Sequence, residues 1–290
     1  ALAQQDGLLD YDAPVSTYIP EFKGGGKESI TLRHLLTHSA GIPSVAFTDV
    51  LTPEKWQAGV DAFCAAKVEW PPGSKTAYHA LSGAFVAAEA VRRVSGMKSW
   101  PDICRERLFD PLGATSLTFG LPPAGTPVSL GPQPRELPAA LDGAHFGLLG
   151  HPAGGCIGAP RDVLKVLQLF LNGGTWEGKI LLKPETVDEM LRVQYMEERL
   201  SAIKAGKKPT HEFWGLGWLT RGDTNTGWFG FGDQISEASF GHAGLDTVIG
   251  VADPETKLSL VFITTDSPKT PEQTTLLRNT VTNLVAKAIR

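Results

Sequence analysis

Tyr78 is the first residue of this chain whose setting suits acid–base chemistry. It ends a short segment that follows the turn Pro71-Pro72-Gly73, and a helix is predicted to begin soon after it. A tyrosine held there can act as a general base if nearby cations lower its pKa from the reference value of about 10. Taken alone, the segment favours a tyrosine that only packs in the fold, so the assignment depends on what surrounds the phenol.

A second candidate lies in the segment 239–245, which leads into a predicted hairpin. Gly244 allows a ligand to approach the strand backbone closely, and the N–H of Leu245 can point at a developing oxyanion. His242 can orient a carboxylate or carbonyl group, or share a proton with Tyr78. Taken alone, a histidine before a strand is more often a structural residue.

A third segment, 150–158, is rich in glycine and precedes a predicted helix that begins near Arg161-Asp162. Glycines before a helix can cradle an anion. The spacing matches neither the dinucleotide-binding pattern nor a P-loop. The segment is therefore interpreted as a tight turn that needs small residues.

Three other patterns resemble catalytic or metal-binding motifs but lack a residue or a setting that those motifs need. His34 and His38 have the spacing of a zinc pair on a helix, but Leu35 stands where a metalloprotease has glutamate. Ser-x-x-Lys occurs at Ser95 and at Ser201, at a predicted helix end and in a polar stretch respectively, where a lysine does not activate a serine. There is no Gly-x-Ser-x-Gly. No metal and no cofactor is expected.

Composition excludes several classes of protein. Hydrophobic residues make up 42% of the 290 residues, enough for a buried core. The net charge of −4, with charges scattered, gives no reason to expect nucleic acid. No apolar run approaches the roughly 18 residues that span a bilayer. Three cysteines without metal spacing indicate free thiols, and the compartment stays undetermined.

Local patterns predict a mixture of helices and strands. Helices are expected from residue 31 towards Gly41, over 52–67 and 80–94, after Pro160, and at the end of the chain. Residues 247–251 and 257–264 flank the turn Asp253-Pro254-Glu255-Thr256 and predict an antiparallel hairpin. The fold class is therefore α+β.

Taken together, the segments resemble the serine β-lactamase-like superfamily of class C β-lactamases, D-Ala-D-Ala carboxypeptidases and family VIII carboxylesterases. The similarity covers essentially the whole chain in order. It rests on five matches: residues 7–22, the segment 30–41, Pro72-Gly73 with Tyr78, Gly154-Gly155 followed by Arg161-Asp162-Val163, and His242-Ala243-Gly244.

The resemblance implies a β-lactamase or penicillin-binding-protein fold, an antiparallel sheet flanked by helices plus a mostly helical subdomain. Residues 1–290 would form one domain, with the helical subdomain and insertions over about 31–235 and the sheet hairpin and C-terminal helix over about 236–290. The first strands of the family sheet would be missing.

Two departures from the family pattern bear on activity. The Tyr motif usually continues to an asparagine, whose position is Ala80 here, and Tyr-His-Ala favours the esterase branch. The nucleophilic Ser-x-x-Lys is expected about ten residues before Ala1. We therefore expect a truncated sequence, inactive as given, in preference to a gene that begins here.

By resemblance, the complete protein would form an acyl-enzyme on an upstream serine. Tyr78 would act as the base, His242 would support it, and the N–H of Leu245 would contribute to the oxyanion hole. His79, Ala243 and Gly244 would contact substrate.

The expected substrate is a small ester or amide. A β-lactamase or D-amino-acid peptidase is the alternative of the same fold, and a catalytically dead ligand-binding homologue is the alternative of another class. A homo-oligomer is one assembly that the sequence allows. Trp214, Trp218 and Trp228 hint at an apolar acyl pocket.

Overall fold

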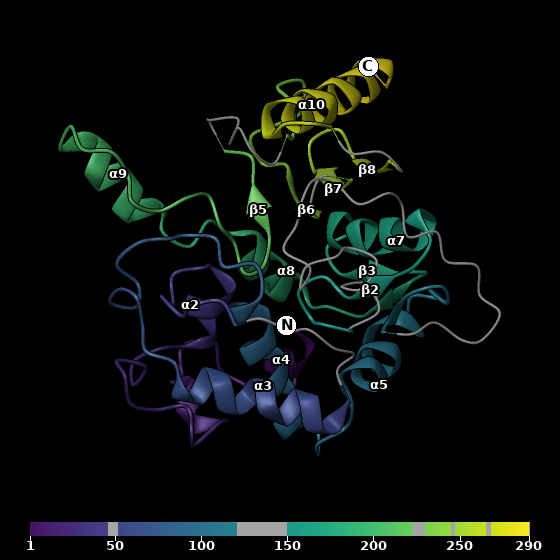
Figure 1. Ribbon diagram of the computed structural model, residues 1–290. Coiled ribbons are helices and arrows are strands. Elements are labelled where there is room, and N and C mark those ends of the chain that lie inside the picture. The colour runs from purple at the N-terminus through teal and green to yellow at the C-terminus, as the bar shows by residue number, and fades with distance from the viewer. Residues whose placement is uncertain (46–51, 121–149, 223–229, 245–246, 265–267, 290) are drawn as a thin grey trace.

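A four-stranded antiparallel sheet and several helices make up the described part of the chain. The computed structural model describes residues 1–45, 52–120, 150–222, 230–244, 247–264 and 268–289. Helices α2, α3 and α4 gather at one end of the molecule, and the sheet lies at the other with α10 over it (Figure 1).

The sheet has the strand order β5-β6-β7-β8. Its strands are β5 (Leu219–Thr220), β6 (Phe240–Gly244), β7 (Val248–Asp253) and β8 (Leu258–Ile263). His242 of β6 lies opposite Gly250 of β7. The buried carboxylate of Asp253 closes the β7–β8 turn by accepting the N–H of Glu255 at 3.0 Å and the hydroxyl of Thr256 at 2.9 Å. The predicted hairpin is confirmed.

Two helices bury different sets of side chains against this sheet. Helix α7 (Pro160–Leu171) contacts β7 and β8, and its Leu167 packs with Phe240 and Ala252. Helix α10 (Pro271–Ala288) contacts β8, and its Ala286 shares a core with Ile249 of β7. Alternate residues of the strands thus enter different cores, as the pleat of a β-strand requires.

A third core fills the helical end of the molecule. Helix α3 (Pro53–Ala65) begins at Thr52, whose hydroxyl accepts the N–H of Lys55 at 3.3 Å. Helix α4 (Ser82–Val94) crosses α2 (Leu32–Leu36) closely because Gly83 has no side chain. A Cβ at Gly83 would lie 2.6 Å from the carbonyl oxygen of Leu35. This contact fixes the position of α2.

The remaining elements are short. They are α1 (Leu2–Gln5), the 3₁₀ turn η1 (Val15–Thr17), α5 (Trp100–Cys104), the π-helical turn η2 (Arg105–Phe109), β1 (Thr118–Phe119), β2 (Cys156–Ile157), β3 (Thr175–Trp176), β4 (Lys179–Ile180), α8 (Pro184–Leu191) and α9 (Met196–Lys204). Strands β1 and β2 pair with each other, as do β3 and β4.

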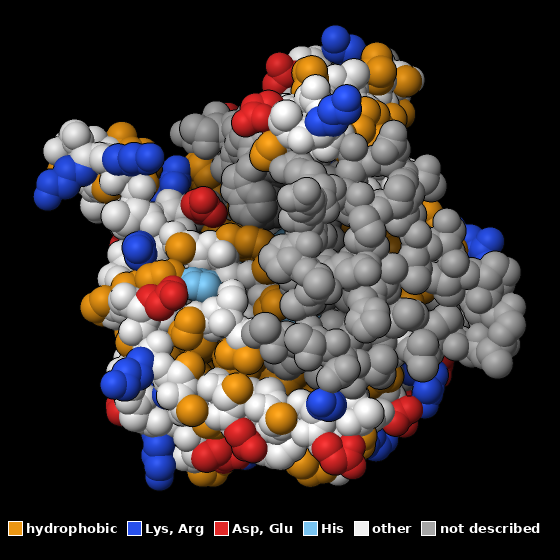
Figure 2. Space-filling view, viewed as in Figure 1, with side chains coloured by type: hydrophobic (Ala, Val, Ile, Leu, Met, Phe, Trp, Pro, Cys, Tyr) orange, Lys and Arg blue, Asp and Glu red, His pale blue; other side chains and the backbone are white. Residues whose placement is uncertain are grey.

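Helix α9 differs from the others because it projects from the body (Figure 1). None of its residues is buried, and Leu200 and Ile203 are 58% and 52% exposed. In the space-filling view this arm carries a group of Lys and Arg side chains (Figure 2). Its sequence is polar enough to stand in solvent on most of its surface.

Sequence patterns predicted the larger elements. The helices over 52–67 and 80–94, the helix after Pro160 and the last helix are confirmed, as is the α+β class. Residues 240–244 of the segment 239–245 form strand β6 rather than only an approach to the hairpin, and β5 adds a fourth strand. Helix α2 ends at Leu36, earlier than the pattern towards Gly41 suggested. The domain limits stay a prediction.

Two further observations concern membranes and metal ions. Within the described ranges, no helix is long and apolar enough to cross a membrane. The same part of the chain contains no group of three or more His, Cys, Asp or Glu side chains that could hold a metal ion.

Candidate active site

The Tyr78 segment is held on both sides by backbone hydrogen bonds. At the preceding turn, the N–H of Gly73 donates to the carbonyl of Ser39 at 2.9 Å, and its own carbonyl accepts from Nε2 of His211 at 3.0 Å. Gly73 has φ +79°, and a Cβ there would lie 3.1 Å from Nε2 of His34. Glycine is therefore required by conformation and by space.

The next residues are tied to the segment that precedes β5. The N–H of Thr76 donates to the carbonyl of Thr210 at 3.0 Å, and its hydroxyl accepts the N–H of Glu212 at 2.8 Å. The N–H of Ala77 donates to the carbonyl of His38 at 3.0 Å. The loop that carries the tyrosine is thus bonded to His38 and to the segment that precedes β5.

Four aromatic rings from separate segments meet at this loop. The ring of His38 lies 4.6 Å from that of Tyr78 and 4.4 Å from that of Trp214, measured between centroids. Tyr78 and Trp214 are stacked at 6.0 Å with an interplanar angle of 7°. His242 lies 5.8 Å from Tyr78 and 5.9 Å from Trp214. We call these four residues the ring cluster.

Burial sets the protonation state of the ring cluster. Tyr78 is 37% exposed, so its ring can be reached from outside, while burial of part of its surroundings raises its pKa to about 12. Burial, with smaller contributions from His242 and His79, lowers the pKa of His38 to about 3. Burial also lowers the pKa of His242. All three groups are neutral at pH 7, and a phenolate at Tyr78 requires a cation next to its oxygen.

His242 reaches the ring cluster from strand β6. Its Nδ1–H donates to the carbonyl of Ala243 at 2.7 Å, which leaves Nε2 as the acceptor of the neutral ring. The side chain of Ala243 belongs to the core beneath the sheet, so only its backbone is available to a ligand. A Cβ at Gly244 would lie 2.7 Å from Cγ1 of Val248. Leu245 lies outside the described residues.

The side chain of His79 contacts Glu69 and Trp70. Its Nε2 donates to a carboxylate oxygen of Glu69 at 3.1 Å, and its ring lies 4.9 Å from that of Trp70. Its backbone N–H donates to Nδ1 of His38 at 3.4 Å. His79 and His38 line one small pocket, together with Ser82 and neighbouring apolar residues.

The two histidines with zinc-pair spacing have separate roles. Nδ1 of His34 accepts the N–H of Thr31 at 3.2 Å, while the hydroxyl of Thr31 accepts the N–H of His34 at 3.3 Å, a reciprocal cap of α2. His38 lies beyond the end of α2, in a left-handed conformation with φ 54°. The i, i+4 pattern is meaningful only on a continuous helix. Because α2 ends before His38, the pattern did not indicate that His38 belongs to the site.

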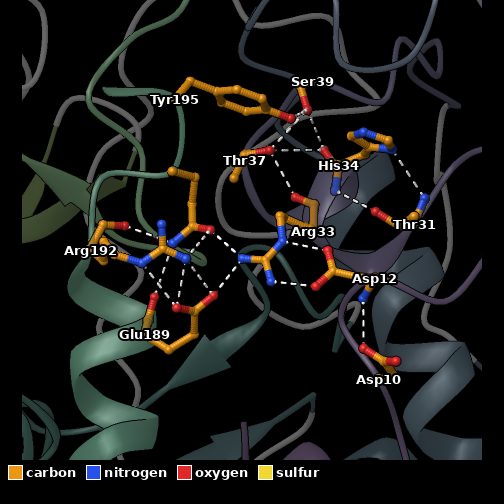
Figure 3. A network of polar contacts seen from close by, with 11 residues as sticks. Asp10, Asp12, Thr31, Arg33, His34, Thr37, Ser39, Glu189, Arg192 and Tyr195 are labelled. Carbon is orange, nitrogen blue, oxygen red and sulfur yellow. Dashed lines mark hydrogen bonds and ion pairs between the residues drawn. The ribbon is translucent and has the colours of Figure 1, made fainter. Parts of the chain in front are cut away.

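A network of charged and polar groups surrounds Arg33 of α2 (Figure 3). Arg33 makes two bonds to Asp12, of 2.6 and 2.7 Å, and one to Glu189 of 2.5 Å. It also bonds Gln194, and Glu189 pairs with Arg192 at 2.7 Å. We call these five residues the arginine network.

Protonation in the arginine network is opposite to that in the ring cluster. Hydrogen bonds from Arg33 lower the pKa of Asp12. Burial on its own would raise the pKa of Glu189, but bonds from Arg33 and Arg192 outweigh it and lower that pKa. The carboxylates are therefore stabilised in their charged forms.

A chain of hydroxyl groups connects the end of α2 with Tyr195, directly before α9. The hydroxyl of Thr37 lies 2.9 Å from that of Ser39, which lies 2.8 Å from that of Tyr195 (Figure 3). The ring of Tyr195 stacks on that of His211 at 4.2 Å. Since His211 bonds Gly73, this chain closes a loop of contacts around the Tyr78 segment.

The other candidates have structural explanations. Gly154 and Gly155 both donate their N–H groups to the carbonyl of His151, at 3.1 and 2.7 Å, which agrees with a tight turn. Ser95 caps the end of α4, and Lys98 pairs with Glu106 at 2.5 Å. Ser201 lies on the exposed helix α9.

Comparison with known proteins identifies the family. The family profile described as Beta-lactamase matches residues 1–281. The chain belongs to the beta-lactamase family. The resemblance inferred from the motifs is thereby confirmed, and the family places the chain within a superfamily of serine hydrolases that contains esterases, β-lactamases and penicillin-binding proteins.

Relatives with curated descriptions are longer than this chain. The chain is 26% identical over 301 residues to "Esterase/beta-lactamase LipL" of Mycobacterium tuberculosis, covering 89% of the chain and 63% of the relative. It is 23% identical to "N-acetylmuramyl-L-alanine amidase" of Bacillus subtilis, covering 89% and 62%. The chain thus spans less than two thirds of the length of these relatives.

Solved structures agree on the fold. A family VIII carboxylesterase superposes with a TM-score of 0.71 at 22% identity, covering 97% of this chain and 79% of the other. A penicillin-binding protein homologue from Caulobacter crescentus gives 0.68 at 22% identity, with coverage of 97% and 79%. The β-lactamase-type α+β fold is therefore established for the described residues.

Proposed function

We propose that this chain carries the acid–base half of a serine hydrolase that acts on small esters through an acyl-enzyme. The observation that carries the proposal is the convergence of Tyr78 and His242, from two distant segments, in a ring cluster that outside molecules can reach at Tyr78. The family of the chain supports a hydrolase.

In the proposed reaction, a serine outside these 290 residues attacks the ester carbonyl. Tyr78, as phenolate, accepts the serine proton and then donates it to the alkoxide leaving group, and a water molecule releases the acyl group. The phenolate requires a cation, because burial alone raises the pKa of Tyr78. We assign that cation to a lysine that accompanies the serine.

Three further assignments complete the proposal. His242, whose ring lies 5.8 Å from that of Tyr78 and whose Nε2 is left as an acceptor, supports the phenol of Tyr78. The N–H of Leu245 contributes one donor to the oxyanion hole, and the neighbouring Gly244 lets the acyl oxygen approach. His79 is engaged with Glu69 and contributes through its backbone rather than as a substrate ligand.

The residue at position 80 favours ester substrates over β-lactams. Ala80 follows His79 where the family pattern has an asparagine, so the side-chain amide that would contact a β-lactam is absent at that position. The full-length protein should therefore hydrolyse p-nitrophenyl butyrate with a higher kcat/KM than a chromogenic cephalosporin. The reverse order would favour a β-lactamase, and no turnover of either, with no serine adduct from a p-nitrophenyl alkylphosphonate, would favour a binding protein.

The base assignment is tested by Tyr78→Phe in the full-length protein. Removing a general base typically lowers kcat by about 10² to 10⁴, while the stacking with Trp214 is retained. Tyr18→Phe is the matched control, because the hydroxyl of Tyr18 only accepts the N–H of Asp10, at 2.7 Å, away from the ring cluster. Parent-like turnover by Tyr78→Phe would falsify the base assignment.

A further inference from the structure

His38 has a backbone conformation that residues other than glycine adopt at a cost. It is one of four described non-glycine residues with positive φ, and the other three, Met97, Glu177 and Lys257, are exposed. At the end of α2 the N–H of Ser39 bonds the carbonyl of His34 at 2.9 Å, the helix-ending geometry that normally selects glycine at the position of His38. The contacts of the His38 side chain can explain why a residue other than glycine occupies this position.

The contacts of His38 lie on both sides of Tyr78. Its carbonyl accepts the N–H of Ala77 at 3.0 Å, and its ring Nδ1 accepts the N–H of His79 at 3.4 Å. One residue therefore bonds the backbone N–H groups of both residues that flank the tyrosine, Ala77 and His79. Its ring also packs against the Tyr78 ring itself, 4.6 Å away.

The left-handed conformation makes this double contact possible. Immediately after α2 the chain turns, so that the carbonyl and the ring of His38 both face the Tyr78 loop, which lies 40 residues later in the sequence. Nδ1 can accept a hydrogen bond only in the neutral ring with the proton on Nε2. Burial, which lowers the pKa of His38 to about 3, keeps the ring in that form at neutral pH.

We propose that His38 is a positioning residue for Tyr78, aiming its phenol by accepting the N–H groups of Ala77 and His79 through its carbonyl oxygen and Nδ1. The inference rests on the proposed role of Tyr78 as the base. Errors of about 1 Å in the placement of a reacting group cost about a hundredfold in rate. The Nδ1 bond is therefore expected to influence kcat, with little effect on KM.

The variant His38→Gly removes the Nδ1 bond together with the ring that packs on Tyr78, and it introduces no backbone strain. Glycine adopts φ 54° without strain and keeps the carbonyl that holds Ala77, but it has no acceptor for the His79 N–H. In the full-length protein we expect kcat for p-nitrophenyl butyrate to fall about tenfold to a hundredfold, with KM little changed. His38→Asn should recover most of this loss, because asparagine tolerates the left-handed region and its Oδ1 can replace Nδ1.

Two controls separate positioning from stability. Lys257→Gly relieves the same kind of backbone conformation, φ 58°, in the β7–β8 turn and should leave kcat unchanged. In a double-mutant cycle, His38→Gly should cost nothing further once Tyr78→Phe is present, because His38 acts only through the phenol. An equal loss of kcat in both backgrounds overturns the proposal.

Amide hydrogen exchange tests the inference without any activity. In His38→Gly the His79 amide should exchange at least about tenfold faster, whereas the Ala77 amide should keep its protection. Unchanged protection of His79 overturns the proposal, whatever the turnover. Parent-like activity of Tyr78→Phe combined with the expected exchange pattern would instead reject only the base role. If His38→Gly fails to fold, His38→Asn gives the converse test, because asparagine tolerates φ 54° and offers Oδ1: the His79 amide should keep its protection, and loss of that protection would overturn the proposal.

Discussion

The two regions around helix α2 are stabilised in opposite ways. Arg33, within the helix, is joined to Asp12 and Glu189 by charged hydrogen bonds that favour the ionised carboxylates (Figure 3). Just beyond its end, His38 lies among aromatic rings and is kept neutral by burial. A helix of five residues thus joins a charged anchor to an uncharged site.

The difference separates stability from chemistry. In the arginine network each group has the protonation state that its partners favour, which holds α2 in place. In the ring cluster, burial raises the pKa of Tyr78 and lowers the pKa values of His38 and His242. A single charge that arrives nearby can shift such pKa values again. Substitutions in the two regions should therefore affect different measurements.

The largest effect is expected from Arg33→Met. The change leaves the partly buried Glu189 and the amide of Gln194 without their shared donor, so the free energy of unfolding should fall by about 2–3 kcal/mol. Arg105→Met is the matched control, because its pair with Asp102 is exposed, and it should cost about 0.5 kcal/mol or less. Equal losses in urea denaturation would show that the network does not anchor α2.

A smaller effect is expected at the connection between the two regions. Tyr195→Phe removes the bond to the buried hydroxyl of Ser39, which keeps its contact with Thr37. The free energy of unfolding should fall by about 1 kcal/mol. Tyr18→Phe, which loses a bond at a more exposed position, should cost less. The reverse order in thermal or urea denaturation would contradict the hydroxyl chain.

The smallest effect is a difference between the two regions in how the free energy of unfolding depends on pH. The pKa of His38 falls from 6.5 in the unfolded chain to about 3 in the fold, so below pH 6.5 the unfolded state binds more protons and stability is lost as the pH falls. Between pH 7 and 6, His38→Asn should lose about 0.7 kcal/mol less than the parent. A parent-like slope between these pH values would contradict burial of a neutral His38.

Glu189→Gln is the control from the other region. The pKa of Glu189 is lowered from 4.5, so its contribution is complete above that value and is lost only as the pH falls through the lower folded pKa. Its slope between pH 7 and 6 should equal that of the parent. A difference in that interval would show that the two regions do not titrate separately.

Local signals were sufficient to predict much of the fold. Thr52-Pro53 marked the start of α3, and Asp253 marked the turn between two β-branched runs, because caps and turns act within a few residues. Tyr78 and His242 were singled out from their local settings, and the structure brings their rings to 5.8 Å.

Contacts between distant segments escaped prediction. Trp214, which the sequence offered only together with Trp218 and Trp228 as a hint of an apolar pocket, enters the ring cluster 136 residues after Tyr78, and its contact with the phenol ring was not predicted. The role of His38 depends on a left-handed backbone, whereas helical periodicity placed it on the same face as His34. The surroundings of the Tyr78 phenol are thus formed by residues outside the segment that ends in this tyrosine.

The projecting helix α9 has a consequence for how the protein is cut. Because none of its residues is buried, α9 can unfold locally without disturbing the three cores, and such segments are where proteases act first. Arg199 anchors its base through the carbonyl of His211 and the ring of Phe213. Limited trypsin digestion should therefore nick the chain near Lys204, and the two pieces should stay together as one folded particle.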